Sequence, residues 1–123
     1  MLLPYHYFLF FCLSLLLTGC NSQADELDQA SRSYKAHRDY ASLEVINGHL
    51  RKGMAQSKVE DLLGEADYSP IAGQYYYSSD RSEVAGSGKE RMNVTVGLVV
   101  EYRDDQGQLT EQLQSFWLGR IRE

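Results

Sequence analysis

Few residues of this 123-residue chain have the type and spacing that chemistry requires. The nearest candidates for metal ligands are His37 and His49, which lie twelve residues apart with no cysteine or carboxylate at a recognised ligand spacing. Glu60 and Asp61 are neighbours, so on a helix their side chains diverge and cannot work together as a general acid and base. No serine, histidine and aspartate fall into a nucleophile motif. We therefore predict a non-catalytic protein with no metal and no cofactor.

The start of the chain has the pattern of a secretory signal peptide. Phe8 to Leu17 contains a single polar residue and is about half as long as the roughly 20 apolar residues that span a bilayer as a helix. The residues Leu17-Thr18-Gly19-Cys20 resemble the lipobox of bacterial lipoproteins, although no Lys or Arg precedes the apolar run. The resemblance implies cleavage between Gly19 and Cys20, so that residues 1–19 are removed and Cys20 carries covalent lipid.

The residues after the lipobox bear on where the protein would reside. In enteric-type lipoproteins an Asp directly after the acylated Cys favours the inner membrane, whereas here Asn21 and Ser22 follow Cys20. The resemblance therefore implies an outer-membrane, lipid-anchored protein that faces the periplasm. Cys12 would leave with the signal peptide, so the mature chain has no thiol for a disulfide.

Composition is that of one folded domain, with 43% hydrophobic and 24% charged residues. The formal net charge is −5, and all 12 Lys and Arg and all 17 Asp and Glu follow Cys20. This acidic balance disfavours nucleic acid and anionic membrane surfaces as electrostatic partners.

Two helices are predicted after a polar segment. Residues 20–39 contain only Leu27 and Tyr34 as larger apolar groups, and we expect them to form a solvated tether or a weak helix. Apolar residues then recur at spacings of three and four from Tyr40, which predicts a helix over about 40–50. A second short helix ends at Gly64 and begins either at Ala55 or, with a better cap, at Ser57.

Three strands are predicted after the helices. Tyr75 to Tyr77 is an aromatic run suited to a strand, and we expect the polar stretch from Ser78 to Glu90 to be a mobile loop. Asn93 to Arg103 alternates between apolar and other residues, and Leu109 to Leu118 can return antiparallel to it. The predicted fold class is α+β, with two short helices packed on a three-stranded antiparallel sheet over residues 40–123.

The segment Arg-Lys-Gly-Met-Ala-Gln-Ser-Lys-Val-Glu-Asp-Leu-Leu-Gly at residues 51–64 resembles the signature of the SmpA/OmlA family of outer-membrane lipoproteins. That signature is Gly-Met-Thr, then a Val, then Leu-Gly-x-Pro, and this chain has Ala55 for the Thr and Ala66 for the Pro. The resemblance covers Ser42 to Trp117, and the family's two-helix, three-strand fold agrees with the predicted order. We expect a structural role for the motif residues, which are Gly53, Met54, Val59, Leu62, Leu63 and Gly64.

The resemblance also implies a function, since the family includes the small lipoprotein subunit of the outer-membrane β-barrel assembly machinery. It implies an accessory binding module in outer-membrane protein assembly or envelope integrity, with that machinery as the partner. Two alternatives remain open. One is a stress-type envelope lipoprotein that binds peptidoglycan, lipid or a small ligand, and the other is an inhibitor-like module that binds another protein.

Aromatic residues are expected on both faces of the sheet. Strand alternation sends Tyr76 opposite to Tyr75 and Tyr77, and Phe116 opposite to Trp117. Because two short helices cover only one face, some of these rings should be exposed to a partner. We therefore expect a partner face among Tyr76, Phe116 and Trp117, unless the tether or the loop after residue 78 folds over it.

Overall fold

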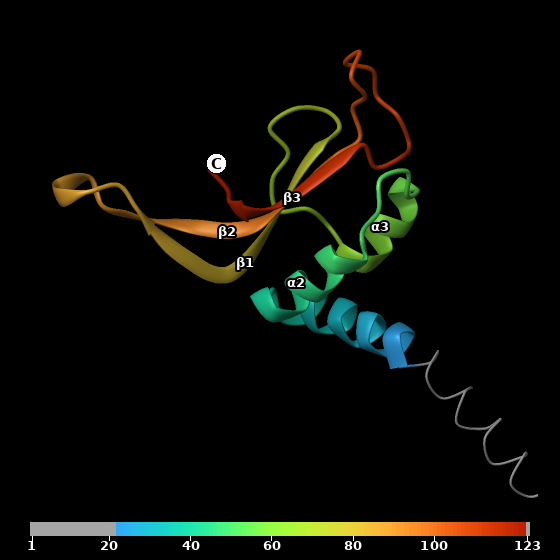
Figure 1. Cartoon of the computed structure of the whole chain (residues 1–123), viewed down its shortest axis with the longest axis horizontal. Helices are drawn as coiled ribbons and strands as arrows, with labels where there is room; N and C mark the ends of the chain where they lie inside the picture. Colours follow the sequence, from blue (N-terminus) through green and yellow to red (C-terminus); the bar gives the residue numbers. More distant parts are fainter. Residues whose placement is uncertain (1–21, 123) are drawn as a thin grey trace, which may run out of the picture.

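A three-stranded antiparallel sheet in the order β1-β2-β3 forms one layer of the protein, and helices pack on one of its faces (Figure 1). The computed structural model describes residues 22–122. Within this range the predicted α+β class and three-stranded sheet are confirmed, and the number of helices is three rather than two. The proposed signal peptide, Gly19 and Cys20 lie outside the described residues. None of the helices in residues 22–122 has the length and apolar character needed to cross a membrane.

The additional helix covers residues 22–37 and lies in the segment for which a tether or a weak helix was expected. The segment is helical, which was one of the two expectations, but the expectation that it remains solvated was wrong. Tyr34 is fully buried, Ala30 is 6% exposed, and Leu27 packs against the same core. Two hydroxyl groups complete the docking, because Ser31 donates to the Leu62 carbonyl at 2.7 Å and Tyr34 donates to a carbonyl of β1.

Helix α2 (Tyr40–His49) agrees with the predicted helix and presents Leu43 and Ile46 to the core, both fully buried. Asp39 caps its first turn, with a carboxylate oxygen accepting from the Ser42 N–H at 3.1 Å. Hydrogen bonds from the Ser42 and Ser33 side chains to this carboxylate help to hold the pKa of Asp39 below its ordinary value. The cap therefore fixes the junction between the first two helices.

Helix α3 (Gln56–Leu63) begins after Ala55, which resolves the ambiguity about its start. Ala55 supplies no side-chain cap, and α3 ends at Gly64, whose φ of 78° and ψ of −152° suit glycine alone. Val59 and Leu63 are fully buried. Gly53, with a φ of 93°, forms the turn before the helix. The expected structural role of the motif thus agrees with the positions of its glycines and apolar residues.

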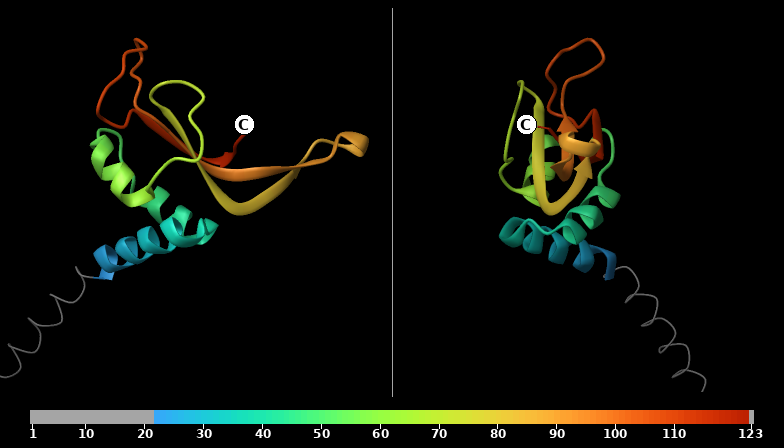
Figure 2. Two further views of the ribbon diagram at one scale, coloured as in Figure 1. Left: turned by 180° about the vertical axis from the view of Figure 1, so that it is seen from behind. Right: turned by 90° about the vertical axis from the view of Figure 1, so that its left-hand side faces the viewer.

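Strand β1 (Gln74–Ala85) continues well past the tyrosine run, so the expected loop from Ser78 to Glu90 was wrong over most of its length. A register shift between Ser78 and Ser82 marks a bulge, after which β1 pairs with β2 as far as Ala85 and Met92. The end of this β1–β2 ribbon, with the 3-10 helix η1 (Gly88–Glu90), projects away from the helices (Figure 2). In the part of β1 after Ser78, Ala85 is the only buried residue, which agrees with the mostly polar sequence of this part of the strand.

Strands β2 (Met92–Glu101) and β3 (Ser115–Arg120) pair antiparallel, with Val99 opposite Trp117 and Val100 opposite Phe116. The return strand was predicted from Leu109, but residues 109–114 form a connection instead. Within it Ala55 and Gln112 make an isolated bridge, which ties the connection to the start of α3. The core between sheet and helices contains large fully or almost fully buried side chains, namely Tyr34, Leu43, Ile46, Leu50, Val59, Leu63, Tyr77, Leu98, Val100, Tyr102 and Leu113.

Candidate functional site

The sheet face opposite the helices carries a row of apolar side chains, which we call the open-face row. Its members are Tyr68, Tyr76, Val99 and Trp117, each paired with the next across the sheet. Trp117 is 48% exposed and Tyr68 42% exposed, whereas Val99 between the larger rings is 1% exposed. The rings of Tyr68 and Tyr76 meet edge to face with centroids 5.7 Å apart. The row is thus an ordered apolar strip with exposed rings at both ends.

Of the three aromatic residues expected on the partner face, Tyr76 and Trp117 are in the open-face row and Phe116 is not. Phe116 pairs with Val100 and packs against the buried core on the helix side of the sheet. The correction follows from strand alternation, which places Phe116 and Trp117 on opposite faces, together with the register that sends Phe116 toward the helices. Neither the N-terminal helix nor the expected loop folds over Trp117, which remains half exposed.

The residues in the rows on either side of the open-face row have small or polar side chains. Ser78, Gly97 and Gly119 form the neighbouring row on one side. On the other side the Gln74 amide donates to the Glu101 carboxylate at 3.2 Å. The Trp117 ring lies along its own strand, 3.5 Å from the position of a Cβ built on Gly119. An apolar strip with a polar rim has the character of a protein-binding surface.

Tyr68 was not identified from the sequence because it lies in a connection rather than a predicted strand. The connection runs from Gly64 to Gln74, and Tyr68 and Tyr76 exchange main-chain hydrogen bonds of 3.3 and 2.8 Å. The Asp67 carboxylate accepts from the Ser78 N–H at 2.8 Å, which extends this pairing along the edge of β1. The aromatic side chain of Tyr68 is the only feature of the sequence that could have indicated its role, because its pairing partner Tyr76 lies eight residues further along the chain.

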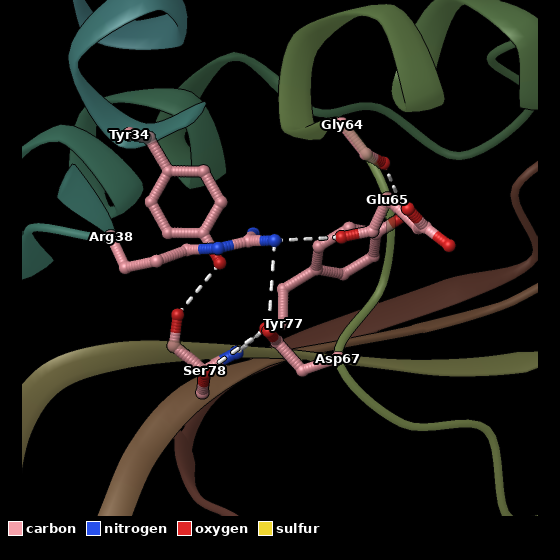
Figure 3. Close-up of polar contacts among 7 residues, drawn as sticks. All are labelled: Tyr34, Arg38, Gly64, Glu65, Asp67, Tyr77 and Ser78. Carbon is pink, nitrogen blue, oxygen red and sulfur yellow. Dashed lines mark hydrogen bonds and ion pairs between the residues drawn. The ribbon is translucent and has the colours of Figure 1, made fainter. Parts of the chain in front are cut away.

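A polar cluster around Arg38 holds this connection against the helices (Figure 3). The Arg38 guanidinium donates to the Glu65 carbonyl at 2.8 Å, lies 3.6 Å from an Asp67 carboxylate oxygen and stacks 4.8 Å from the Tyr34 ring centroid. Arg38 has a φ of 56°, an uncommon value for a non-glycine residue, at the junction between the first two helices. We interpret this cluster as a clamp that fixes Tyr68 and its connection relative to β1.

Three buried tyrosines lie beneath the clamp and the sheet. Burial raises the pKa of Tyr34 to about 12 and is also the main cause of the raised pKa values of Tyr77 and Tyr102. Tyr34 donates to the Ser78 carbonyl, while the Tyr102 hydroxyl has no hydrogen-bond partner within residues 22–122. These phenols stay protonated at neutral pH and belong to the core.

An open groove of about 670 Å³ lies between α3 and β1. It is lined by four acidic residues, Glu60, Asp61, Glu65 and Asp67, and by three tyrosines, Tyr68, Tyr75 and Tyr77. Among residues 22–122 no three His, Cys, Asp or Glu side chains lie close enough to hold a metal ion, and His37 and His49 belong to no such group. The groove is acidic and partly aromatic, a character that suits a cationic group.

Comparison of the chain with protein-family profiles, with curated proteins and with solved structures found no match. The resemblance of residues 51–64 to the SmpA/OmlA signature therefore remains a prediction from the sequence.

Proposed function

We propose that this protein is a non-catalytic lipoprotein of the bacterial outer membrane that binds an envelope protein through the open-face row. The observation that carries the proposal is the exposure of Trp117, 48%, and Tyr68, 42%, at the ends of an ordered apolar strip. Large aromatic side chains with apolar neighbours and a polar rim are typical of residues that anchor protein interfaces. The two exposed rings lie at opposite ends of one strip, so a partner that contacts both of them binds in a defined orientation.

The lipobox and the SmpA/OmlA-like segment support the cellular part of the proposal. Acylation of Cys20 would attach the chain to the membrane with more than one acyl chain, which gives lasting anchorage. In this proposal the partner is a subunit of the outer-membrane β-barrel assembly machinery, and the chain is an accessory to assembly. The net charge of −5 agrees with a protein partner better than with anionic lipid headgroups.

A second candidate function rests on the groove between α3 and β1. The Asp67 carboxylate is already engaged by Arg38 and Ser78. The other three acidic residues and the tyrosines of the lining would accommodate an amine or guanidinium on an apolar stem, through charge attraction and contact with the rings. A stress-type envelope protein that binds a small cationic ligand would use this groove, which Tyr68 of the open-face row also lines, and would leave Trp117 unoccupied. Charge-neutralising substitutions such as Glu60→Gln and Asp61→Asn would then abolish binding, whereas Trp117→Ala would not.

Site-specific photo-crosslinking in cells tests the leading proposal. A photoreactive phenylalanine analogue would replace Trp117 in the full chain, and a matched control would carry it at Met92, which is 60% exposed at the far end of the β1–β2 ribbon. We expect position 117 to give a discrete product that contains a barrel-assembly subunit, and position 92 to give none. The Cys20→Ser chain, which cannot be acylated, should lose the product.

Two results would contradict the proposal. Equal crosslinking at positions 117 and 92 would show that the row has no special role. A Trp117→Ala chain that is folded and still crosslinks from Tyr68 to the same subunit with unchanged yield would remove Trp117 from the interface.

A further inference from the structure

The two edge strands of the sheet differ in whether their outward main-chain groups are hydrogen-bonded. Along β1 the outward main-chain groups are occupied, because Tyr76 pairs with Tyr68, the Ser78 N–H bonds the Asp67 carboxylate, and the Asp80 N–H bonds the Arg38 carbonyl at 2.9 Å. A bulge follows between Ser78 and Ser82. Covering groups and bulges are the devices by which proteins close a sheet edge.

Strand β3 forms the other edge, and no segment of the described chain covers it over most of its length. The Ile121 N–H donates to the Thr95 carbonyl at 2.9 Å, so by alternation the main chains of Ser115, Trp117 and Gly119 face β2. The main chains of Phe116, Leu118 and Arg120 therefore point outward. Among the described residues no hydrogen bond joins these outward groups to another segment. The strand contains no proline or lysine that would discourage pairing.

The open part of this edge has a defined length. Leu113, just before β3, exchanges main-chain hydrogen bonds with Gly53 and Met54 at 2.7 and 2.8 Å, and the Gln56 N–H donates to the Glu111 carbonyl at 2.8 Å. The segment 53–56 thus occupies the outer side of residues 111–113 and stops an added strand there. The free edge runs from residue 115 to residue 121, and Leu118 is its centre.

We propose that a second copy of this chain pairs with β3 antiparallel, about a two-fold axis at Leu118, to form a continuous six-stranded sheet. Each Leu118 pairs with its counterpart, and Phe116 of each copy pairs with Arg120 of the other. Because 116, 118 and 120 are the outward residues, this register satisfies their N–H and carbonyl groups with six intersubunit hydrogen bonds. Symmetry of this kind is the commonest in soluble oligomers.

The side chains agree with this register. Trp117 of one copy lies opposite Gly119 of the other, and because glycine adds no side chain, only the two indole rings, each lying along its own strand over Gly119, have to share this part of the face. Phe116 lies opposite Arg120, which favours contact between the ring and the cation. No two like charges lie opposite each other, because Arg120 is the only charged residue of β3. Both helix layers lie on the same side of the joined sheet, and the open-face rows of the two copies lie on the other side.

Substitution of Arg120 tests the pairing with a matched control. Arg120→Pro removes an outward N–H, and proline is tolerated on an edge strand whose N–H faces solvent. Arg120→Ala keeps that N–H but, like the proline variant, loses the ion pair of 3.0 Å with Glu83. Sedimentation equilibrium of the full chain in non-ionic detergent, over about 1 to 100 μM, would measure dimerisation, since a small edge interface is expected to bind in the micromolar range.

We expect Arg120→Ala to dimerise only severalfold more weakly than wild type, through loss of the ring–cation contact, and Arg120→Pro to be at least about tenfold weaker than Arg120→Ala. A monomeric wild-type chain at the highest concentration would overturn the proposal and would favour an extended segment of another protein as the occupant of the edge. Equal dimerisation of the proline variant would also overturn it.

A second measurement keeps the proposal testable if Arg120→Pro does not fold. In a Cys12→Ser, Cys20→Ser background, Leu118→Cys would place two thiols at the two-fold axis, where paired Cα atoms lie about 5.5 Å apart, within disulfide range. Lys89→Cys, in the exposed η1 turn, is the control. Mild oxidation should give a disulfide dimer for Leu118→Cys alone. Equal yields at both positions would indicate random collision and reject the register.

Discussion

The phenol of Tyr34 donates a 2.7 Å hydrogen bond to the main-chain carbonyl of Ser78, and so connects the N-terminal helix to β1 across 44 residues. The same ring lies 4.8 Å from the Arg38 guanidinium, which in turn holds the connection that carries Tyr68. The segment expected to form a solvated tether or a weak helix therefore takes part in positioning one end of the open-face row.

Removal of the Tyr34 phenol should destabilise the fold. Tyr34→Phe leaves the Ser78 carbonyl without its partner, and we expect a loss of about 1–2 kcal/mol in the free energy of unfolding. Tyr68→Phe is the control, because its ring is 42% exposed, and it should change stability by no more than about 0.5 kcal/mol. Urea denaturation of both variants checks this. Equal losses would show that the phenol to carbonyl bond has no specific contribution.

Alkaline pH should destabilise the protein through its buried tyrosines. The pKa of Tyr34 is raised to about 12 in the folded state, above the ordinary value of 10.0, so the folded chain holds a proton that the unfolded chain loses. This contribution is complete below pH 10 and is lost as pH rises from about 10 toward 12, at up to about 1.4 kcal/mol per pH unit. Tyr77 and Tyr102 act in the same direction.

The measurement is the difference in unfolding free energy between wild type and Tyr34→Phe from pH 8 to pH 11. We expect the wild type to lose stability more steeply above pH 10, while lysine titration affects both chains alike. Parallel curves would contradict the assignment of a raised pKa to Tyr34.

The parts of the fold that follow from short-range patterns could be predicted from the sequence. The alternation from Val94 to Tyr102 predicts a strand because one side of it meets the core, and apolar spacing predicts α2 for the same reason. The β1 strand beyond Ser78 could not be predicted in this way, since Ala85 is the only buried residue in that part of β1 and no alternation of apolar residues marks it. Aromatic residues alone were the signal for the partner face.

The N-terminal helix and the partner face depended on long-range contacts instead. Tyr34 is one of two large apolar residues in a polar segment, and its burial comes from partners on α3 and β1 that no local pattern indicates. Phe116 and Trp117 were known to lie on opposite faces, but only the register with β2 decides which of them meets the helices. Tyr68 joined the row through a bridge to Tyr76 that lies outside the regular strands.

Acid should weaken the junction at Asp39. Its pKa is lowered, first through the Ser42 hydrogen bond, so the ionised carboxylate stabilises the fold above the ordinary value of 3.8, and this contribution is lost as pH falls below it. Asp39→Ala should cost about 1 kcal/mol at neutral pH through loss of the α2 cap. The loss of stability caused by Asp39→Ala should be smaller at pH 2, because the carboxylate of the wild-type chain is then largely protonated. Thermal unfolding at both pH values checks this, and a cost independent of pH would show that charge is not involved.

Two glycines should respond to alanine in opposite directions. Gly48 lies inside α2, and a Cβ there meets nothing within 4 Å, so Gly48→Ala should stabilise the protein by about 0.5–1 kcal/mol through helix propensity. A Cβ on Gly97 would press on the Tyr77 carbonyl and lie 2.9 Å from the Ile121 side chain and 3.1 Å from the Ser78 Cα. Main-chain atoms of β1 cannot move aside without breaking the ladder, so Gly97→Ala should destabilise by more than about 2 kcal/mol. Chemical denaturation of both variants measures the contrast, and a neutral Gly97→Ala would mean that β1 and β2 approach less closely than their register requires.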